Sequence, residues 1–474
     1  MLEAEMAVGS EGGADPDVQG LAAFAAGITT AELPGAVVDR VTDIVVDTVG
    51  TAVLGSRDGF LTALRASMLG HATGGARVLG TELSADAGWA AFCNAAACTT
   101  VQLDEGHRQS IGHPGIHVAL PALAVAEQEG ASGEELVAAV AAAYEVAVRI
   151  GLALGRLRPG LHAHGHWPVI GGAVGVAKLL GAGEAGLVAA IEGAATLLLY
   201  PTTRTTTDGT DVHHYYAGLG ALIAVSAGYG AAAGMSASDH TLAEHLVPFS
   251  GSPGLDRGAL AAGSRNGGVD GYHVLGNYFK VEPVCAHAIP ALEAVQSLLT
   301  EIGPDAGLSS ATVRTYAYAA ELHGREPTSS LAAKFSIPYV VAGVLEAGAS
   351  GLALHELDPT DPALRDVMGR VDVVCDPVLD RQYPHRRPAH VELELDDGRV
   401  LSAECDMPLG DAANPVPRER LGQKFREMTA PVLGADRSSA LLERMLSLAS
   451  APTVSEISEL ARPAREDGQG VTDE

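Results

Sequence analysis

Two acidic residues and two histidines fall within one short segment, residues 103–115 (LDEGHRQSIGHPG). The acids are Asp104 and Glu105, and the histidines are His107 and His113. Imidazole exchanges a proton near neutral pH, and a neighbouring carboxylate fixes which ring nitrogen carries it. Loops held between rigid elements are where catalytic groups concentrate. The segment therefore predicts an acid/base centre, with a solvated polar loop as the alternative.

Three histidines alternate at His162, His164 and His166. On an extended segment their side chains would share one face and could bind a metal, whereas on a helix His164 would turn away. Gly165 and Pro168 make a regular strand doubtful. No HExxH motif or carboxylate-rich partner accompanies them. We therefore predict no metal site and favour the wall of a polar pocket.

A third polar segment, residues 205–218 (TTTDGTDVHHYYAG), contains His213. Its Asp-Gly-Thr portion is typical of a turn or a helix N-cap, and the amides that follow could hold a carboxylate. A capping turn that binds no ligand is the alternative.

Lys280 is one of only four lysines and lies among aromatic and apolar residues (NYFKVEPVCAH, 277–287). A partly buried lysine there could bind a substrate carboxylate or act as an acid/base with a depressed pKa. A surface lysine whose stem covers apolar groups is the alternative.

The composition limits the partners of such a site. The 474 residues include 30 Lys plus Arg and 58 Asp plus Glu, a formal net charge of −28. This charge repels phosphate backbones and anionic bilayers, so we exclude nucleic acid and membrane as partners, while a locally positive pocket could take a small carboxylate substrate. The five cysteines form no CxxC pair, the N-terminus has no signal-peptide pattern, and the apolar stretches are interrupted before membrane-spanning length. These features predict a reduced, cytoplasmic protein.

The elements that must position these groups are mostly helices. Residues 19–270 are predicted to form a helical domain in which several Ala-rich helices are apolar all round, which indicates a buried bundle. Its helices are expected over 35–55, 87–101, 115–130, 168–181, 184–198 and 215–234.

The pattern changes after residue 270. A smaller α+β domain is predicted over 271–412, followed by a return to helix over 413–462. A turn at Asp397-Gly398 predicts a β-hairpin. Residues 1–18 and the acidic tail 463–474 are predicted to be disordered. The strands are expected over 311–318, 389–396 and 400–403, and the helices over 287–302, 331–347 and 361–370.

In their order along the chain, these motifs resemble the MmgE/PrpD family, whose members include 2-methylcitrate dehydratase, cis-aconitate decarboxylase and iminodisuccinate epimerase. The resemblance covers about residues 21–460. It rests on AFCN at 91–94 with the segment 103–115, GGA…KLLG at 171–181, GT…YAG at 209–218, KxxPxC at 280–285 and AKFSIPY at 333–339.

The resemblance implies a mostly α protein: a large all-helical MmgE/PrpD domain formed by both chain ends, with an inserted smaller α+β lid domain. It also implies an active site between the two domains that needs no metal or organic cofactor, and a homodimer. The fold agrees with the organisation inferred above from the residue pattern.

Position by position, the resemblance places His113 on an active-site histidine of the family and Lys280 on its lid-side lysine. Asp104 falls on the acidic dipeptide of the family. Gln102 stands where the family has an active-site aspartate, and His213 stands where it has a second lysine.

Other positions remain open, because His162 fits an ungapped count back from Lys178 while His166 fits the local spacing of the family. Tyr339 ends the AKFSIPY motif and is expected to contact substrate. With Gln102 and His213 these residues form the expected substrate-binding set.

We expect a lyase or isomerase that removes a proton α to a carboxylate or carbonyl. His113 would be the acid/base, assisted by Asp104 or His107, while Lys280 and His213 would hold carboxylates and the developing enolate. Dehydration of a 2-methylcitrate-like hydroxy acid comes first, and decarboxylation or epimerisation comes second. A binding protein without turnover is a further hypothesis, and a zinc metallohydrolase is the last.

Overall fold

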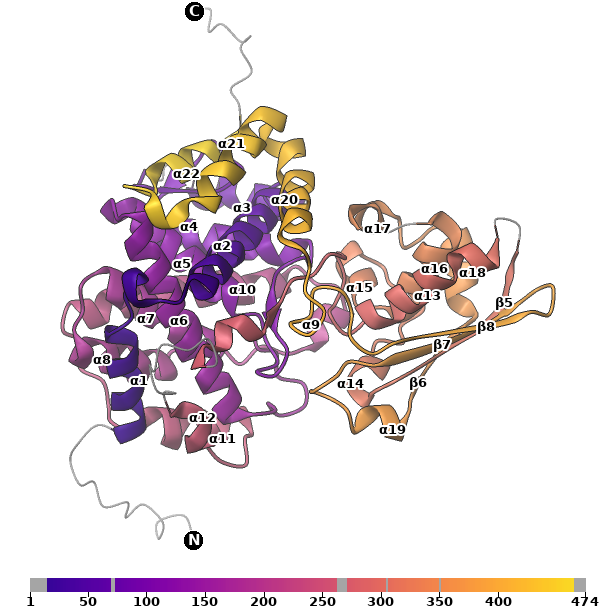
Figure 1. Ribbon diagram of the computed structural model, residues 1–474, viewed down its shortest axis with the longest axis horizontal. Helices are drawn as coiled ribbons and strands as arrows, with labels where there is room; N and C mark the ends of the chain where they lie inside the picture. The colour runs from indigo at the N-terminus through magenta and orange to yellow at the C-terminus, as the bar shows by residue number, and fades with distance from the viewer. Residues whose placement is uncertain (1–14, 70–72, 262–270, 304–305, 349–350, 464–474) are drawn as a thin grey trace, which may run out of the picture.

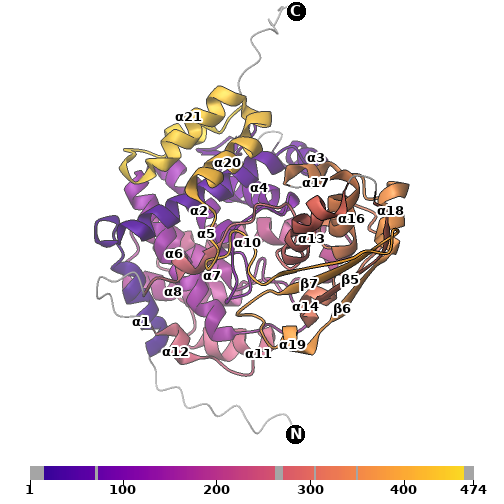
Figure 2. The ribbon, with the colours of Figure 1, turned by 45° about the vertical axis from the view of Figure 1, so that its right-hand side comes forward.

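The helical part of the molecule has one hydrophobic core to which both ends of the chain contribute. The structure is a computed structural model that describes residues 15–69, 73–261, 271–303, 306–348 and 351–463. The core contains residues from Val18 to Phe279 and from Val416 to Ala461. It is closed by α20 (Arg418–Leu433), which packs along α2 (Gly35–Gly55) in both views (Figures 1 and 2).

Most of this part is helical, as predicted, and the helices predicted over 35–55, 87–101, 115–130, 168–181, 184–198 and 215–234 are confirmed to within a few residues. Besides α2 and α20, the α-helices of this part, which include the other confirmed ones, are α1 (Pro16–Ala26), α3 (Gly59–Leu69), α4 (Ala87–Thr100), α5 (Pro114–Glu129), α6 (Gly133–Leu154), α7 (Pro168–Leu179), α8 (Glu184–Thr196), α9 (Arg204–Thr207), α10 (Val212–Ala232), α11 (Val247–Ser250), α12 (Arg257–Leu260), α21 (Ala435–Leu446) and α22 (Ser455–Leu460). Short helical turns are η1 (Thr30–Glu32), η2 (Leu242–Leu246), η4 (His273–Gly276) and η5 (Leu448–Ser450). Two short antiparallel pairs join β1 (Ala76–Arg77) to β2 (Ser84–Ala85) and β3 (Gly106–His107) to β4 (Asn277–Tyr278).

Small residues let α7 approach its neighbours closely. A Cβ atom at Gly171 would lie 2.2 Å from the carbonyl oxygen of Ala143 on α6, and one at Gly172 would lie 2.1 Å from that of His117 on α5. The low aromatic content, 4% of the chain, is therefore compensated by helix backbones that lie close together.

The second hydrophobic core is built from residues between Val284 and Leu395. It lies against a four-stranded sheet in the order β6-β5-β7-β8, in which only the β5–β6 pair is parallel. Helices α13, α16 and α18 lie on one face of this sheet (Figure 1). The strands are β5 (Leu308–Thr315), β6 (Val371–Cys375), β7 (Ala389–Leu395) and β8 (Val400–Cys405). The helices are α13 (Ile289–Ile302), α14 (Ala317–Ala320), α15 (Ser330–Lys334), α16 (Ile337–Ala347), α17 (Leu352–Glu356), α18 (Pro362–Gly369) and α19 (Pro377–Asp380).

The predicted hairpin of β7 and β8 is confirmed, with Gly398 at φ +82° in its turn. Two other expectations for this part are confirmed only in part, and one strand was not expected. The strand expected over 311–318 ends at Thr315, because α14 follows immediately. The helix expected over 331–347 is two helices, because Ser336 caps α16 through the Tyr339 amide at 3.0 Å. Strand β6 was not expected, since five residues carry too little pattern.

Two expectations about the chain ends and the apolar stretches also change. Helix α1 begins at Pro16, inside the segment predicted as disordered, while residues 1–14 and 464–474 lie outside the described residues. Helix α6 is long and apolar enough to cross a membrane by length and composition, contrary to the expected interruption, but 94% of its most apolar window is buried inside the protein.

Candidate active site

Three of the four lysines hold the loop between α4 and α5, residues 101–113, together with the residue that precedes it. All three are buried and come from distant parts of the chain. Their ammonium groups contact acceptors on this stretch: Lys280 to Asp104 Oδ1 at 3.1 Å, Lys334 to the Thr100 carbonyl at 2.6 Å and Lys424 to the Leu103 carbonyl at 2.9 Å. Both hydrophobic cores therefore fix this loop.

The short β3–β4 pair brings Lys280 to the loop. Gly106 pairs with Tyr278 and His107 pairs with Asn277, although about 170 residues separate the two strands. A Cβ atom at Gly106 would lie 2.4 Å from the Tyr278 hydroxyl, so only glycine allows this approach. Lys280, two residues after the pair, then reaches Asp104.

His113 immediately precedes α5 and faces a large cavity. Its Nδ1 lies 2.8 Å from Asp104 Oδ2 and 2.8 Å from the carbonyl oxygen of Glu105. Both neighbours are acceptors, so Nδ1 carries the proton and Nε2 keeps its lone pair. Burial alone would raise the pKa of Asp104, but Lys280 and His113 outweigh it and hold that pKa well below its usual value. His113 therefore has the carboxylate partner of a general base.

Glu105 links this loop to α5 and α6 through its carboxyl group. Burial raises its pKa to about 8. Its side chain accepts hydrogen bonds from the Gly115 amide, the Tyr144 hydroxyl at 3.1 Å and Asn277. The glycine of the His-Pro-Gly sequence is required here, since a Cβ atom would lie 2.4 Å from Glu105 Oε1.

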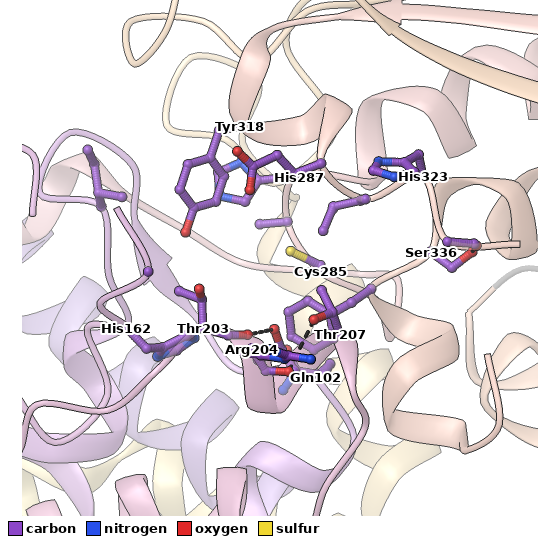
Figure 3. Close-up of a pocket in the computed structure, with 18 of the residues that line it drawn as sticks. Gln102, His162, Thr203, Arg204, Thr207, Cys285, His287, Tyr318, His323 and Ser336 are labelled. Atoms are coloured by element: carbon purple, nitrogen blue, oxygen red, sulfur yellow. Dashed lines mark hydrogen bonds between the residues drawn. The ribbon is translucent and has the colours of Figure 1, made fainter. Parts of the chain in front are cut away.

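The cavity lies between the two hydrophobic cores and measures about 1250 Å³. Gln102, His113 and His162 line it from the helical part, and His287 and Tyr318 line it from the α+β part. Figure 3 shows Tyr318 and His287 on one side of this space and His162 and Gln102 on the other. A molecule that spans this cavity would therefore contact both parts of the chain.

Neutral imidazoles form much of the wall beside His113. His164 stacks on His113 with ring centroids 5.2 Å apart, and His162 stacks on His164 at 4.8 Å. Burial, together with repulsion between the histidines, lowers the pKa of His162 to about 3 and those of His164 and His213 well below the usual value. At neutral pH these three rings are uncharged donors and acceptors.

Gln102 and His213 lie side by side, but only Gln102 lines the cavity, whereas His213 is buried, so the predicted contact of His213 with a substrate carboxylate is wrong for this structure. Gln102 Nε2 lies 3.4 Å from His213 Nε2. The backbone of Gln102 has φ +55°, a conformation that residues other than glycine rarely adopt. The His213 Nδ1 atom has no hydrogen-bond partner among the described residues. Gln102 therefore presents a neutral polar group to the cavity, which suits a hydroxyl, carbonyl or amide group of a ligand better than a carboxylate.

Six of the nine residues expected at the site do not line the cavity. Asp104 and His213 contact lining residues and Lys280 contacts Asp104, whereas the other three lie elsewhere. His107 is buried against Ser110, Tyr144 and His273, because β3 turns its side chain away from His113. Of the alternating histidines, His162 and His164 face the cavity, whereas His166 contacts Ser250 at 3.2 Å. The Tyr339 hydroxyl donates to the Leu354 carbonyl at 2.8 Å. These three side chains support the fold around the site.

Lys280 contacts Asp104 but does not reach the cavity. Its side chain is 0% exposed, and it is not among the residues that line the cavity. The geometry therefore gives Lys280 the role of balancing the Asp104 charge, in place of the predicted contact with a substrate carboxylate.

Arg387 is a cavity residue that the sequence analysis missed. Its side chain is buried in the loop before β7. The signal available in the sequence was the arginine-rich run 381–387 (RQYPHRR) in a chain with 58 acidic and 30 basic residues. Arg108 positions this loop by donating to the carbonyl oxygens of Pro384 and His385 while pairing with Asp411 at 2.8 Å.

One group of side chains has the donors of a metal site. The candidate ligand atoms of Asp104, His113 and His164 lie within 4.8 Å of one another. The Lys280 ammonium, at 3.1 Å from Asp104, already supplies the positive charge that a metal would bring. The donor set therefore fits an ion pair better than a metal.

Comparisons with known proteins identify the family of the chain. Residues 19–246 match the model of the MmgE/PrpD N-terminal domain, and residues 283–448 match that of the MmgE/PrpD C-terminal domain. Two curated sequences of cis-aconitate decarboxylase from Aspergillus terreus are each 24% identical to this chain. One alignment (strain NIH 2624 / FGSC A1156) covers 90% of this chain and 91% of the relative, and the other covers 92% and 94%.

Proposed function

The chain belongs to the MmgE/PrpD family, and from this membership we propose that it is a lyase that decarboxylates an unsaturated di- or tricarboxylic acid without a cofactor. The observation that carries the proposal is the contact between His113 and Asp104 at the wall of the interdomain cavity. Among the lining residues are five arginines (Arg156, Arg158, Arg204, Arg325 and Arg387) and three acidic residues (Glu321, Glu326 and Asp372). This balance favours an anionic substrate in a chain of net charge −28.

In the proposed reaction, His113 first takes up a proton at Nε2, and Asp104 stabilises the resulting imidazolium through Nδ1. The carbon–carbon bond to one carboxylate then breaks, CO₂ departs, and the electron pair is delocalised into the adjacent double bond and carbonyl. His113 delivers its proton to carbon, which restores the neutral imidazole. The step needs a single acid, and His113 supplies it.

Two observations support the proposal of decarboxylation over dehydration. The relatives reported above are named as cis-aconitate decarboxylases. In addition, dehydration needs a second acid to protonate the departing hydroxide, and burial keeps His162, His164 and His213 neutral at pH 7. Dehydration of a 2-methylcitrate-like acid and epimerisation stay predictions that the same assay tests.

The test is incubation of the purified protein with cis-aconitate, 2-methylcitrate and a chiral iminodiacid in D₂O, followed by NMR. We expect cis-aconitate to lose one carboxyl group as CO₂ and to gain deuterium at one carbon of the product. Water loss from 2-methylcitrate instead would support the dehydratase prediction. No turnover and no exchange with any of these acids would refute the proposal.

Two controls in this assay test the binding-protein and metallohydrolase hypotheses. A binding protein would be stabilised by these acids in a thermal unfolding experiment without converting them. A zinc metallohydrolase would lose activity after dialysis against EDTA, whereas the proposed lyase keeps its activity.

A further inference from the structure

We propose that Arg387 is the anchor for a second, non-reacting carboxylate of the substrate, which restricts the enzyme to acids with at least two carboxylates. This inference rests on the proposed function, because it names the group that orients the substrate toward His113.

The first argument is the burial of a charge without an anionic partner. Arg387 is 4% exposed, and no carboxylate of a described residue forms an ion pair with it. Its Nε atom has no hydrogen-bond partner among the described residues. A guanidinium stays protonated in proteins, and an uncompensated buried charge is costly. An anion that enters the cavity would remove this cost.

The surroundings of Arg387 hold the guanidinium in place but do not neutralise it. The side chain lies over the ring of Tyr278, with its Cζ atom 4.8 Å from the ring centroid. Tyr316 and Tyr383 stack on each other nearby, with centroids 4.7 Å apart. Burial raises the pKa of Tyr278 to about 12, so this phenol stays neutral. The cation–π contact with Tyr278 therefore orients the guanidinium without supplying a negative charge.

The position of Arg387 relative to the acid/base residue is the second argument. The same Tyr278 ring lies edge-on to His113, with centroids 6.3 Å apart, so one aromatic ring separates the cation from the base. Both Arg387 and His113 line the cavity. A substrate carboxylate that pairs with the Arg387 guanidinium at the cavity wall would therefore place the rest of a small polycarboxylic acid beside His113.

The third argument is that Lys280, the cation expected to bind a substrate carboxylate, already pairs with a carboxylate of the protein. Lys280 is paired with Asp104 at 3.1 Å, and the Gln102–His213 pair is neutral. The side chain of Arg204 is paired with Asp208, and that of Arg325 with Asp372. Among these groups, Arg387 combines full burial, a permanent charge and an Nε donor without an acceptor.

Binding of tricarballylate, a saturated tricarboxylate that cannot be decarboxylated through a neighbouring double bond, tests the anchor separately from turnover. Calorimetry and thermal unfolding would compare the wild type with Arg387→Met, Arg387→Lys and the control Arg386→Met. Arg386 is the adjacent residue, but it is exposed and paired with Asp406 at 3.0 Å. Tricarballylamide, which has the same shape without charge, serves as the control ligand.

We expect Arg387→Met to weaken tricarballylate binding by about 100-fold, as for loss of one partner of a buried charge pair. Without ligand this variant should melt at the same temperature as the wild type or higher, because it removes an unpaired buried charge. Arg387→Lys should retain part of the affinity, and Arg386→Met all of it. A merely structural arginine would instead lower the melting temperature and leave the affinity unchanged.

The inference is overturned if Arg387→Met binds tricarballylate as the wild type does, or if the wild type binds none of tricarballylate, succinate and glutarate. Should Arg387→Met fail to fold, Arg387→Lys decides: wild-type affinity for both tricarballylate and its amide overturns the proposal, and a selective loss for the acid supports it. Charge-dependent binding without any turnover would leave the anchor in place and refute only the proposed lyase activity.

Discussion

Asp104 has a partner on each carboxylate oxygen, the Lys280 ammonium on Oδ1 and the His113 Nδ1 atom on Oδ2. The family resemblance predicted that all three residues belong to one site, because Asp104 and His113 share one segment and Lys280 falls on the lid-side lysine of the family. The sequence could not predict that Lys280 lies behind Asp104, since this depends on the pairing of β3 with β4. It also could not single out Arg387, whose burial is decided by packing in the α+β part.

The Lys280–Asp104 pair predicts a strong coupling between two substitutions. Asp104→Asn leaves a buried ammonium without a carboxylate and should lower the free energy of unfolding by about 3–5 kcal/mol. The double variant Asp104→Asn/Lys280→Met should recover much of this stability while remaining inactive, because His113 has lost its carboxylate. Urea unfolding of the two single variants and the double variant measures the coupling. Additive losses in the double variant would contradict the buried pair.

Glu105 predicts a pH dependence of stability. Its pKa of about 8 in the folded protein exceeds the ordinary 4.5, so between these values only the folded state holds the proton. The free energy of unfolding should therefore fall as pH rises from 4.5 to 8, with at most about 1.4 kcal/mol per pH unit from this group. Glu105→Gln keeps an acceptor for the Gly115 amide but removes the titration.

Urea unfolding at pH 5, 6, 7 and 8 would compare the two proteins, so that other titrating groups cancel in the difference. We expect Glu105→Gln to gain stability relative to the wild type as pH rises. Parallel curves would show that Glu105 is ionised in the folded protein at neutral pH.

Among the elements, the predicted helices and the β7–β8 hairpin could be recognised because periodicity and turn residues are local signals. Strand β6 and the break between α15 and α16 could not, because a five-residue strand and a serine cap carry little pattern. The pairing of β3 with β4, which assembles the site, also could not be predicted. Strands β3 and β4 have two residues each and pair only because the surrounding helices bring them together.

Arg108 predicts an effect on the loop that carries Arg387. Arg108→Ala removes its pairing with Asp411 and its hydrogen bonds to two loop carbonyls, so the loop 381–388 should exchange amide hydrogens faster. Because the substrate anchor is then less well positioned, we expect KM to rise about tenfold while kcat changes little. Arg386→Ala, an exposed arginine of the same loop, is the control. Unchanged exchange together with unchanged KM would contradict this positioning role.

In the whole molecule, two hydrophobic cores meet around one cavity, and lysines from both parts hold the same loop. Residue periodicity predicted the helical character and the inserted α+β part, composition indicated a net negative charge, and the family resemblance supplied the expectation that the inserted part is a lid. Movement of the α+β part as a lid stays a prediction. The contrast between a net charge of −28 and a cavity with several arginines agrees with selection of a small anion over large polyanions.

The homodimer implied by the family resemblance also stays a prediction. We expect a single species of about twice the 48.3 kDa chain mass in light scattering coupled to size exclusion. A monomer across a hundredfold range of protein concentration would contradict it.

The most direct test of the central claim is deuterium transfer from D₂O into the product of cis-aconitate, compared between the wild type and His113→Asn. Asparagine is polar and of similar size but cannot exchange a proton, so kcat and deuterium transfer should fall together by about 10²- to 10⁴-fold while tricarballylate still binds. His390→Asn, on the surface of β7, should behave as the wild type. Undiminished deuterium transfer in His113→Asn would contradict the account, because another group would then deliver the proton to carbon.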